Sequence, residues 1–162
     1  MKVETQKRQP LQILKEMEGY WYIVSTNFPM WNDRKKSDIT LNYTLVDSSK
    51  PYLIDEVKFL KNGKPKIIKG FDYQAPDDPY RFTWRGKGWM AFIKSEWRME
   101  KFSPEEGWAI LRFTKTLFTP AGVDIICRQP QMDPNTLENL QEMVKTDSVL
   151  APMGKGLFTL PL

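Results

Sequence analysis

Histidine is absent from this chain of 162 residues, and cysteine occurs once, as Cys127. Without histidine the chain has no His-ligated haem, no Ser-His or Cys-His nucleophile pair and none of the usual zinc sites. A single cysteine excludes an intramolecular disulfide. Cys127 follows Ile125 and Ile126, which favours a small buried side chain over a nucleophile. We therefore expect no metal and no cofactor.

The sequence also lacks a phosphate-binding glycine loop, a stripe of one charge and a long apolar run. Gly86 and Gly88 in RGKGW do not lie between a strand and a helix, as a phosphate-binding loop requires. They indicate either a plain hairpin bend or a flexible turn that gates entry at a barrel mouth. Basic and acidic residues are interspersed along a chain of net charge +4, so no nucleic-acid partner is expected. No run approaches the roughly 18 apolar residues of a membrane helix.

The N-terminal segment MKVETQKRQP is polar and has no apolar signal core. We expect a cytoplasmic protein for the chain as given, and a periplasmic or secreted one if a signal peptide has been removed.

Aromatic residues are abundant, with six Trp, nine Phe and six Tyr. They exceed what a plain core of this size needs, and either a bulky aromatic core or a barrel with a lined cavity accounts for them. The length fits one domain, which we place at residues 1–162.

Eight short β-favouring runs are separated by turn residues such as Asn62-Gly63 and the SPEEG of residues 103–107. This spacing predicts an all-β fold, an eight-stranded antiparallel up-and-down barrel over residues 19–129 whose closure leaves no free edge. The expected strands are 20–28, 37–46, 52–60, 66–73, 80–85, 96–102, 108–116 and 123–129.

After the barrel the pattern becomes helical. Asp133 is an expected N-cap and Pro134 a first helical residue, and Leu137, Leu140 and Val144 follow at helical spacing. We predict a helix over 134–146 packed on the outside of the barrel, then a short strand at 157–160. Residues 1–10 are expected to be disordered, and 11–18 to plug one barrel end.

Two sequence signatures resemble those of the lipocalins. Gly19-Tyr20-Trp21 resembles their Gly-x-Trp motif at the first strand, and IICRQPQMDPNTLENL resembles their last barrel strand, its arginine and the following helix. The second stretch is most similar to the bacterial and plant apolipoprotein D-like branch of this calycin-superfamily group. The resemblance implies that Trp21 closes the barrel base and that Arg128 lies over its indole, while the family's disulfide is absent.

Strand alternation predicts which side chains face the interior, because charged residues should face water. The expected ligand-binding side chains are apolar and large, with one carboxylate: Leu41, Tyr43, Val57, Phe59, Phe71, Tyr73, Phe82, Trp84, Trp97, Met99, Leu111, Phe113 and Asp124.

Asp124 stands out because Val123, Ile125 and Cys127 form the apolar face suited to the helix, which turns Asp124 inward. A carboxylate in an apolar cavity is costly unless it is protonated, paired or hydrated, so we expect a raised pKa there. A position at the open rim, in water, is the alternative.

The leading hypothesis is binding or transport of a small hydrophobic molecule such as a fatty acid, lysolipid or isoprenoid, held in the barrel cavity. The alternative is a lipocalin-like isomerase, cyclase or dehydratase that uses Asp124 as acid or base, with Tyr43 or Tyr73 as a hydrogen-bond donor. A third reading is an interaction barrel whose interior is filled. We expect a monomer or homodimer and leave peripheral membrane contact open.

Overall fold

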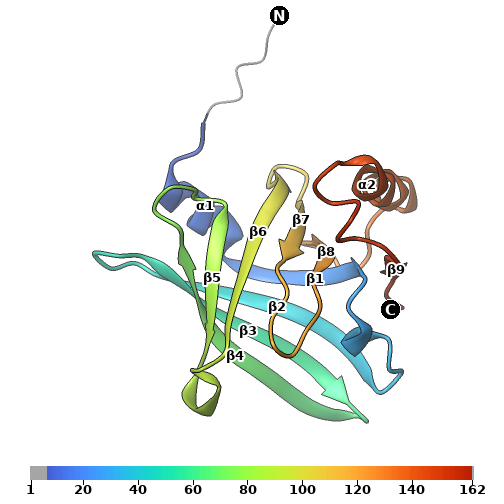
Figure 1. Cartoon of the computed structure of the whole chain (residues 1–162), viewed down its shortest axis with the longest axis horizontal. Coiled ribbons are helices and arrows are strands. Elements are labelled where there is room, and N and C mark those ends of the chain that lie inside the picture. The colour runs from blue at the N-terminus through green and yellow to red at the C-terminus, as the bar shows by residue number, and fades with distance from the viewer. Residues whose placement is uncertain (1–6, 162) are drawn as a thin grey trace, which may run out of the picture.

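The computed structural model describes residues 7–161, and its main element is a closed antiparallel barrel (Figure 1). Each strand pairs with the next in the chain, and β1 pairs with both β2 and β8, which closes the barrel. The predicted eight-stranded up-and-down barrel is therefore confirmed. Its strands are β1 (Gly19–Thr26), β2 (Lys36–Val46), β3 (Tyr52–Lys61), β4 (Lys64–Gln74), β5 (Arg81–Gly86), β6 (Lys94–Ser103), β7 (Trp108–Phe113) and β8 (Gly122–Cys127), and a short β9 (Phe158–Thr159) pairs with β1.

Two α-helices flank the barrel, α1 (Pro10–Met17) at one end and α2 (Pro134–Thr146) on the outside. Neither is long and apolar enough to cross a bilayer, within the part of the chain that the structure describes. Of the segment 1–10 expected to be disordered, residues 1–6 lie outside the described residues. Arg8 departs from that expectation, because it pairs with Glu16 and Glu105 and lies over the Phe102 ring.

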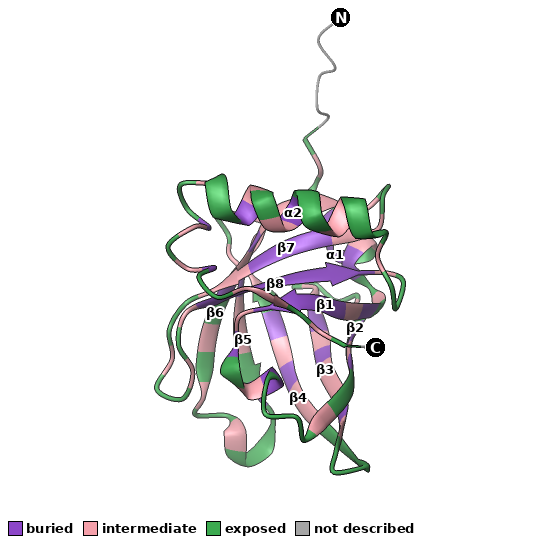
Figure 2. Ribbon diagram, turned by 90° about the vertical axis from the view of Figure 1, so that its right-hand side faces the viewer, coloured by how far each residue is buried: buried purple, intermediate pink, exposed green. Residues whose placement is uncertain are grey.

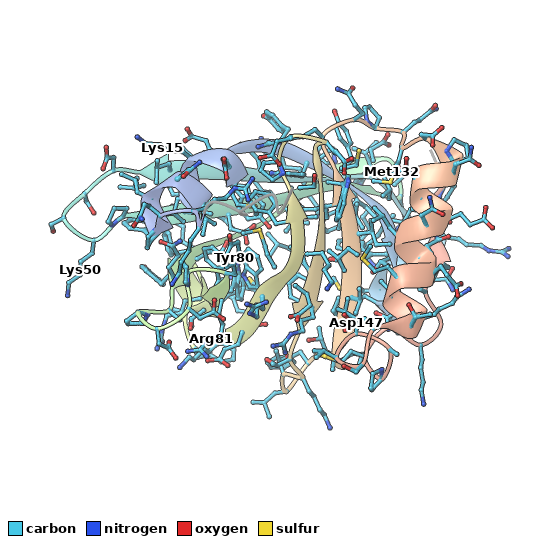
Figure 3. All side chains as sticks on the ribbon, turned by 90° about the horizontal axis from the view of Figure 1, so that it is seen from above. Lys15, Lys50, Tyr80, Arg81, Met132 and Asp147 are labelled. Carbon is cyan, nitrogen blue, oxygen red and sulfur yellow. The ribbon has the colours of Figure 1, made fainter. Side chains whose placement is uncertain are left out.

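Helix α2 lies across β7 and β8 with its polar face outward (Figure 2). Asp133 caps it as predicted, because the Asp133 carboxylate accepts a hydrogen bond from the backbone N–H of Thr136 at 2.9 Å. Met132 and Asp147 mark the two ends of the helix beside the barrel wall (Figure 3). A second core forms between helix and wall, from Val24, Ile110, Val123, Ile125, Cys127, Leu140, Val144 and Leu150.

The two ends of the barrel differ. Because neighbouring strands run in opposite directions, the connections alternate between the ends. Helix α1 and the β2–β3, β4–β5 and β6–β7 turns lie at one end, which we call the base. The other end, the mouth, carries the β3–β4 turn, the β1–β2 loop with η1 (Pro29–Trp31), the β5–β6 loop with η2 (Gly88–Met90), and the β7–β8 loop.

The β3–β4 hairpin corrects one prediction. Asn62 and Gly63 both have positive φ, as a two-residue hairpin turn of the primed type requires. That turn pairs Leu53 with Asp72, so Asp72 faces the interior. Phe71 and Tyr73, predicted to face inward, therefore lie on the outer wall, where both rings pack against Tyr52 with centroids 6.0 and 5.4 Å from it.

Candidate ligand-binding site

The base of the barrel is sealed by Trp21 and Arg128, which the structure brings together. The Arg128 guanidinium lies 3.9 Å from the Trp21 ring centroid, and the indole N–H donates to the Met17 carbonyl at 2.8 Å. Arg128 also donates to three carbonyl oxygens, those of Glu16, Glu18 and Tyr20, at 2.7, 2.9 and 3.0 Å. Arg128 thereby links the end of β8 to α1 and to the start of β1. These contacts close the base of the barrel.

Gly19 is required where it stands beside this seal. Its φ is +105°, in the left-handed region that glycine tolerates, and an added Cβ would lie 3.1 Å from a guanidinium nitrogen of Arg128. The Gly-x-Trp signature therefore has a local physical cause.

A cavity of about 290 Å³ occupies the half of the barrel toward the mouth. Its walls are mainly aliphatic and aromatic, and it reaches the surface at Phe118, which is 66% exposed. Of the residues expected to line it, the following do so: Leu41, Tyr43, Val57, Trp84, Trp97, Phe113 and Asp124.

The half toward the base is filled by side chains. Phe82, Met99 and Leu111 face inward as predicted, yet they belong to the packed core rather than to the cavity wall. Phe59 also belongs to the core, but it lies near the mouth, where its ring packs against Trp31 with centroids 5.4 Å apart. The Phe82 ring stacks on Trp97 with centroids 4.4 Å apart, and this pair forms the floor of the cavity. The interior is therefore partly filled and partly hollow.

Trp84 owes its place in the wall to Gly70. A Cβ at Gly70 would overlap the Trp84 indole, so only glycine lets that ring lie flat against β4. The strand pairing places Gly70 opposite Gly86, a second interior glycine.

Residues from the mouth loops complete the wall, and strand alternation could not identify them because loops have no period. Asn27 is one cause of their placement, because it bridges two segments: its amide donates to the Met153 carbonyl at 2.7 Å and accepts from the Val123 N–H at 2.8 Å. The loop residues in the wall are Phe28, Met30, Trp31, Met90, Ile93, Thr116, Phe118 and Thr119.

Asp124 is 4% exposed and lines the cavity, so its side chain is not at a hydrated rim. Burial raises its pKa to about 7, and the nearby Thr26 hydroxyl offsets only part of that rise. Its Oδ1 atom is buried without a hydrogen-bond partner. This oxygen is therefore available to a ligand.

Two further interior carboxyl groups, Asp55 and Asp72, form a hydrogen-bonded pair across β3 and β4. Asp72 is fully buried, and its Oδ1 accepts a hydrogen bond from Trp97 Nε1 at 2.8 Å. Burial, followed by the charge of Asp55 and the bond between them, raises the pKa of Asp72 well above its usual range. Burial also raises the pKa of Asp55. Asp72 is therefore the more readily protonated of the two, and Asp55 is the one that lines the cavity.

Tyr43 lies within electrostatic reach of all these carboxyl groups. Burial raises the pKa of its phenol first, and the charges of Asp55, Asp72 and Asp124 raise it further. Tyr43 is thus a neutral donor at every physiological pH, and its ring packs against Trp97 with centroids 6.2 Å apart.

Within the part of the chain that the structure describes, no Lys or Arg lines the cavity. Among residues 7–161, no three acidic or cysteine side chains gather as metal ligands. The site therefore combines an apolar pocket with acid groups that have no counter-charge, and it can hold a neutral molecule or exchange a proton with one.

Three solved structures share this architecture. Siderocalin Ex-FABP is 11% identical, with a TM-score of 0.68 over 91% of this chain and 95% of that one. Insecticyanin from the tobacco hornworm Manduca sexta is 18% identical, with a TM-score of 0.69 over 92% and 80%. Lobster apocrustacyanin A1 is 12% identical, with a TM-score of 0.64 over 90% and 77%.

No protein-family model matches the sequence, and no curated protein matches it. At these identities the likeness to solved structures concerns architecture. The closed eight-stranded barrel, its sealed base and its external helix show that the chain has the lipocalin fold.

Proposed function

We propose that this barrel binds one small, largely apolar molecule in the cavity above Trp97. The observation that carries the proposal is a hollow of about 290 Å³ with aliphatic and aromatic walls that reaches the surface at one end. Ligand sites are commonly about 300–1,000 Å³ and mostly apolar, so this one suits a compact ligand.

The interior carboxyl groups narrow the ligand class. A fatty-acid carboxylate placed inside would face Asp124 and Asp55 with no basic side chain to balance it. A hydroxyl or amide group would instead donate to the unpartnered Asp124 Oδ1. A neutral isoprenoid or a lipid alcohol is therefore favoured over an anion whose head enters the cavity.

The three structurally similar proteins support the binding of a small molecule in general. The description of siderocalin Ex-FABP speaks of dual ligand specificities. The Arg128 and helix signature further supports a place in the apolipoprotein D-like branch, which we propose on those residues alone.

Titration with a neutral fluorescent probe such as N-phenyl-1-naphthylamine, followed by displacement with isoprenoid alcohols, tests the proposal. Val57→Trp should abolish binding because the indole fills the cavity, whereas Lys58→Trp adds the same bulk to the next position of β3, whose side chain points outward. Equal binding by both variants would show that the probe sits elsewhere. Absence of saturable binding by the folded wild type would overturn the proposal.

Acid–base turnover of an apolar substrate is a second candidate function, favoured by the buried acid groups. Asp124, with a pKa of about 7, can supply a proton to an alkene or hydroxyl, while Asp55 is placed to accept one. Isomerisation or dehydration needs no more than such a pair in a shaped pocket.

For this second function, Asp124→Asn should stop turnover of a bound isoprenoid while its affinity changes little. Tyr73, named as a donor from the sequence, cannot take part because it faces outward, so Tyr73→Phe is the matched control. Full activity of Asp124→Asn would exclude that residue as the acid.

A further inference from the structure

Four large apolar side chains stand exposed beside the cavity entrance. Trp89 is 80% exposed, Phe92 67%, Leu117 93% and Phe118 66%. They come from two loops, which the ring contact between Phe92 and Phe118, at 6.4 Å, places side by side. We call these four residues the mouth patch. Soluble proteins rarely gather such side chains at one exposed place without a partner.

Three of the four segments at the mouth are basic, whereas the β1–β2 loop and the start of β2 expose Asp33 and Asp38, of which Asp33 pairs with Lys36. The segments 57–71, 85–95 and 113–123 contain no acidic residue. Their exposed lysines take part in none of the ion pairs found among residues 7–161, and they are Lys61, Lys64, Lys66, Lys87, Lys94 and Lys115.

The base has no such basic excess, because acidic side chains stand beside its exposed Lys15 and Lys50. Its turns expose Asp47, Asp77, Glu105 and Glu106. The basic and aromatic segments therefore gather at the mouth, at the lower side of Figure 1, while the base beside α1 carries charges of both signs.

From these observations we propose that the mouth docks on an anionic lipid bilayer, with the mouth patch inserted into the interface. Trp and Phe favour the boundary between headgroups and acyl chains, and exposed lysines beside them bind the negative surface. Phe118 belongs both to the patch and to the cavity wall. Docking therefore brings the entrance against the acyl region, so that an apolar ligand passes between bilayer and cavity without crossing water.

Docking itself does not depend on the cavity, whereas ligand transfer rests on the proposed function. Co-sedimentation with vesicles separates the two. We expect the wild type to bind vesicles of equal parts phosphatidylglycerol and phosphatidylcholine, to bind pure phosphatidylcholine far less, and to dissociate between about 0.1 M and about 0.5 M salt.

Two sets of variants test the two components of docking, the attraction of the lysines to the anionic surface and the insertion of the mouth patch. Each lysine near an anionic surface contributes about fivefold to binding, so reversing Lys87, Lys94 and Lys115 to Glu should weaken partitioning about 100-fold. Trp89→Ser with Leu117→Ser should weaken it at least tenfold. None of these five residues lies in the cavity wall, so binding of the neutral probe in solution should persist. Matched controls are Lys50→Glu at the base and Tyr73→Ser on the outer wall, both expected to bind as the wild type does.

Three results would overturn docking: equal binding to both vesicle types, no binding to either, or a dimer in solution that Trp89→Ser and Leu117→Ser convert to monomer. The last would assign the patch to a second copy of this chain. Loss of probe binding with vesicle binding retained would instead overturn the proposed function and leave docking in place.

Discussion

Replacing Asp124 by Asn should change how the stability of this protein depends on pH. The ordinary pKa of an aspartate is 3.8, and burial raises that of Asp124 to about 7 in the folded state. Between these values the folded chain holds a proton that the unfolded chain has released. The free energy of unfolding therefore falls as pH rises, by about 1.36 kcal/mol for each pH unit.

The size of the effect follows from the gap between the two pKa values. The stabilisation by protonated Asp124 is complete below about pH 4 and is lost as pH rises through about 7, a total of about 4 kcal/mol. From about pH 5 to about pH 7 the loss is about 2 kcal/mol, because the slope flattens as pH approaches the folded-state pKa. Asn cannot ionise, so the variant should gain on the wild type by that amount over the same range.

Urea denaturation followed by tryptophan fluorescence, at several pH values from about 5 to about 8, measures this difference. Because ionisation of Asp55 and Asp72 affects both proteins, subtraction isolates Asp124. Asp47→Asn, at an exposed turn of the base, is the control and should run parallel to the wild type. Parallel curves for Asp124→Asn as well would refute the argument, since they would mean that Asp124 titrates alike in both states.

Three further changes should have measurable results. Asp72→Asn should fold well because the amide oxygen still accepts from Trp97, while Asp72→Ala leaves that indole N–H unpaired and should cost about 1–3 kcal/mol in urea unfolding. Gly70→Ala should push Trp84 from the wall, which costs about 1–3 kcal/mol and changes probe affinity, and unchanged affinity would contradict the packing described. Arg128→Lys should lose about 1–3 kcal/mol, since an ammonium cannot both cover the indole and reach its three carbonyl acceptors, and an unchanged urea midpoint would contradict this.

The elements of the fold were predictable because each has a local cause. Turn residues separate the strands, and the capped helix begins at Pro134 and ends at Thr146, as its apolar spacing predicts. The inward position of Asp124 followed from Val123 and Ile125, which both had to face the helix. Local chemistry and periodicity were sufficient in these places.

The inward-facing residues of β3 and β4 were predicted less well, although the sequence contained the pattern needed to place them. Val57 and Phe59 were placed inside, and the same alternation puts Asp55 inside as well. The two-residue turn then sets Asp72 opposite Leu53. The prediction followed the rule that charged residues face water rather than the register set by the β3–β4 turn. That rule failed here because two carboxyl groups that share a proton satisfy each other. The depth of the hollow had no sequence signal, since it depends on which side chains meet across the barrel.

The lysines at the mouth and the carboxyl groups in the cavity together favour one orientation of an entering ligand. Lysines at the mouth attract an anionic amphiphile, yet the cavity holds Asp55 and Asp124 and no cation. Under the proposed function, a negative headgroup is therefore expected to be stable at the rim and unstable inside, so that such a molecule enters tail first, whereas a neutral alcohol can enter with its hydroxyl toward Asp124. Protonation of Asp124 below about pH 7 removes part of that exclusion, so acidification should strengthen the binding of a short fatty acid more than that of the matching alcohol. Equal pH dependence of the two affinities would show that the interior carboxyl groups take no part in selecting the ligand.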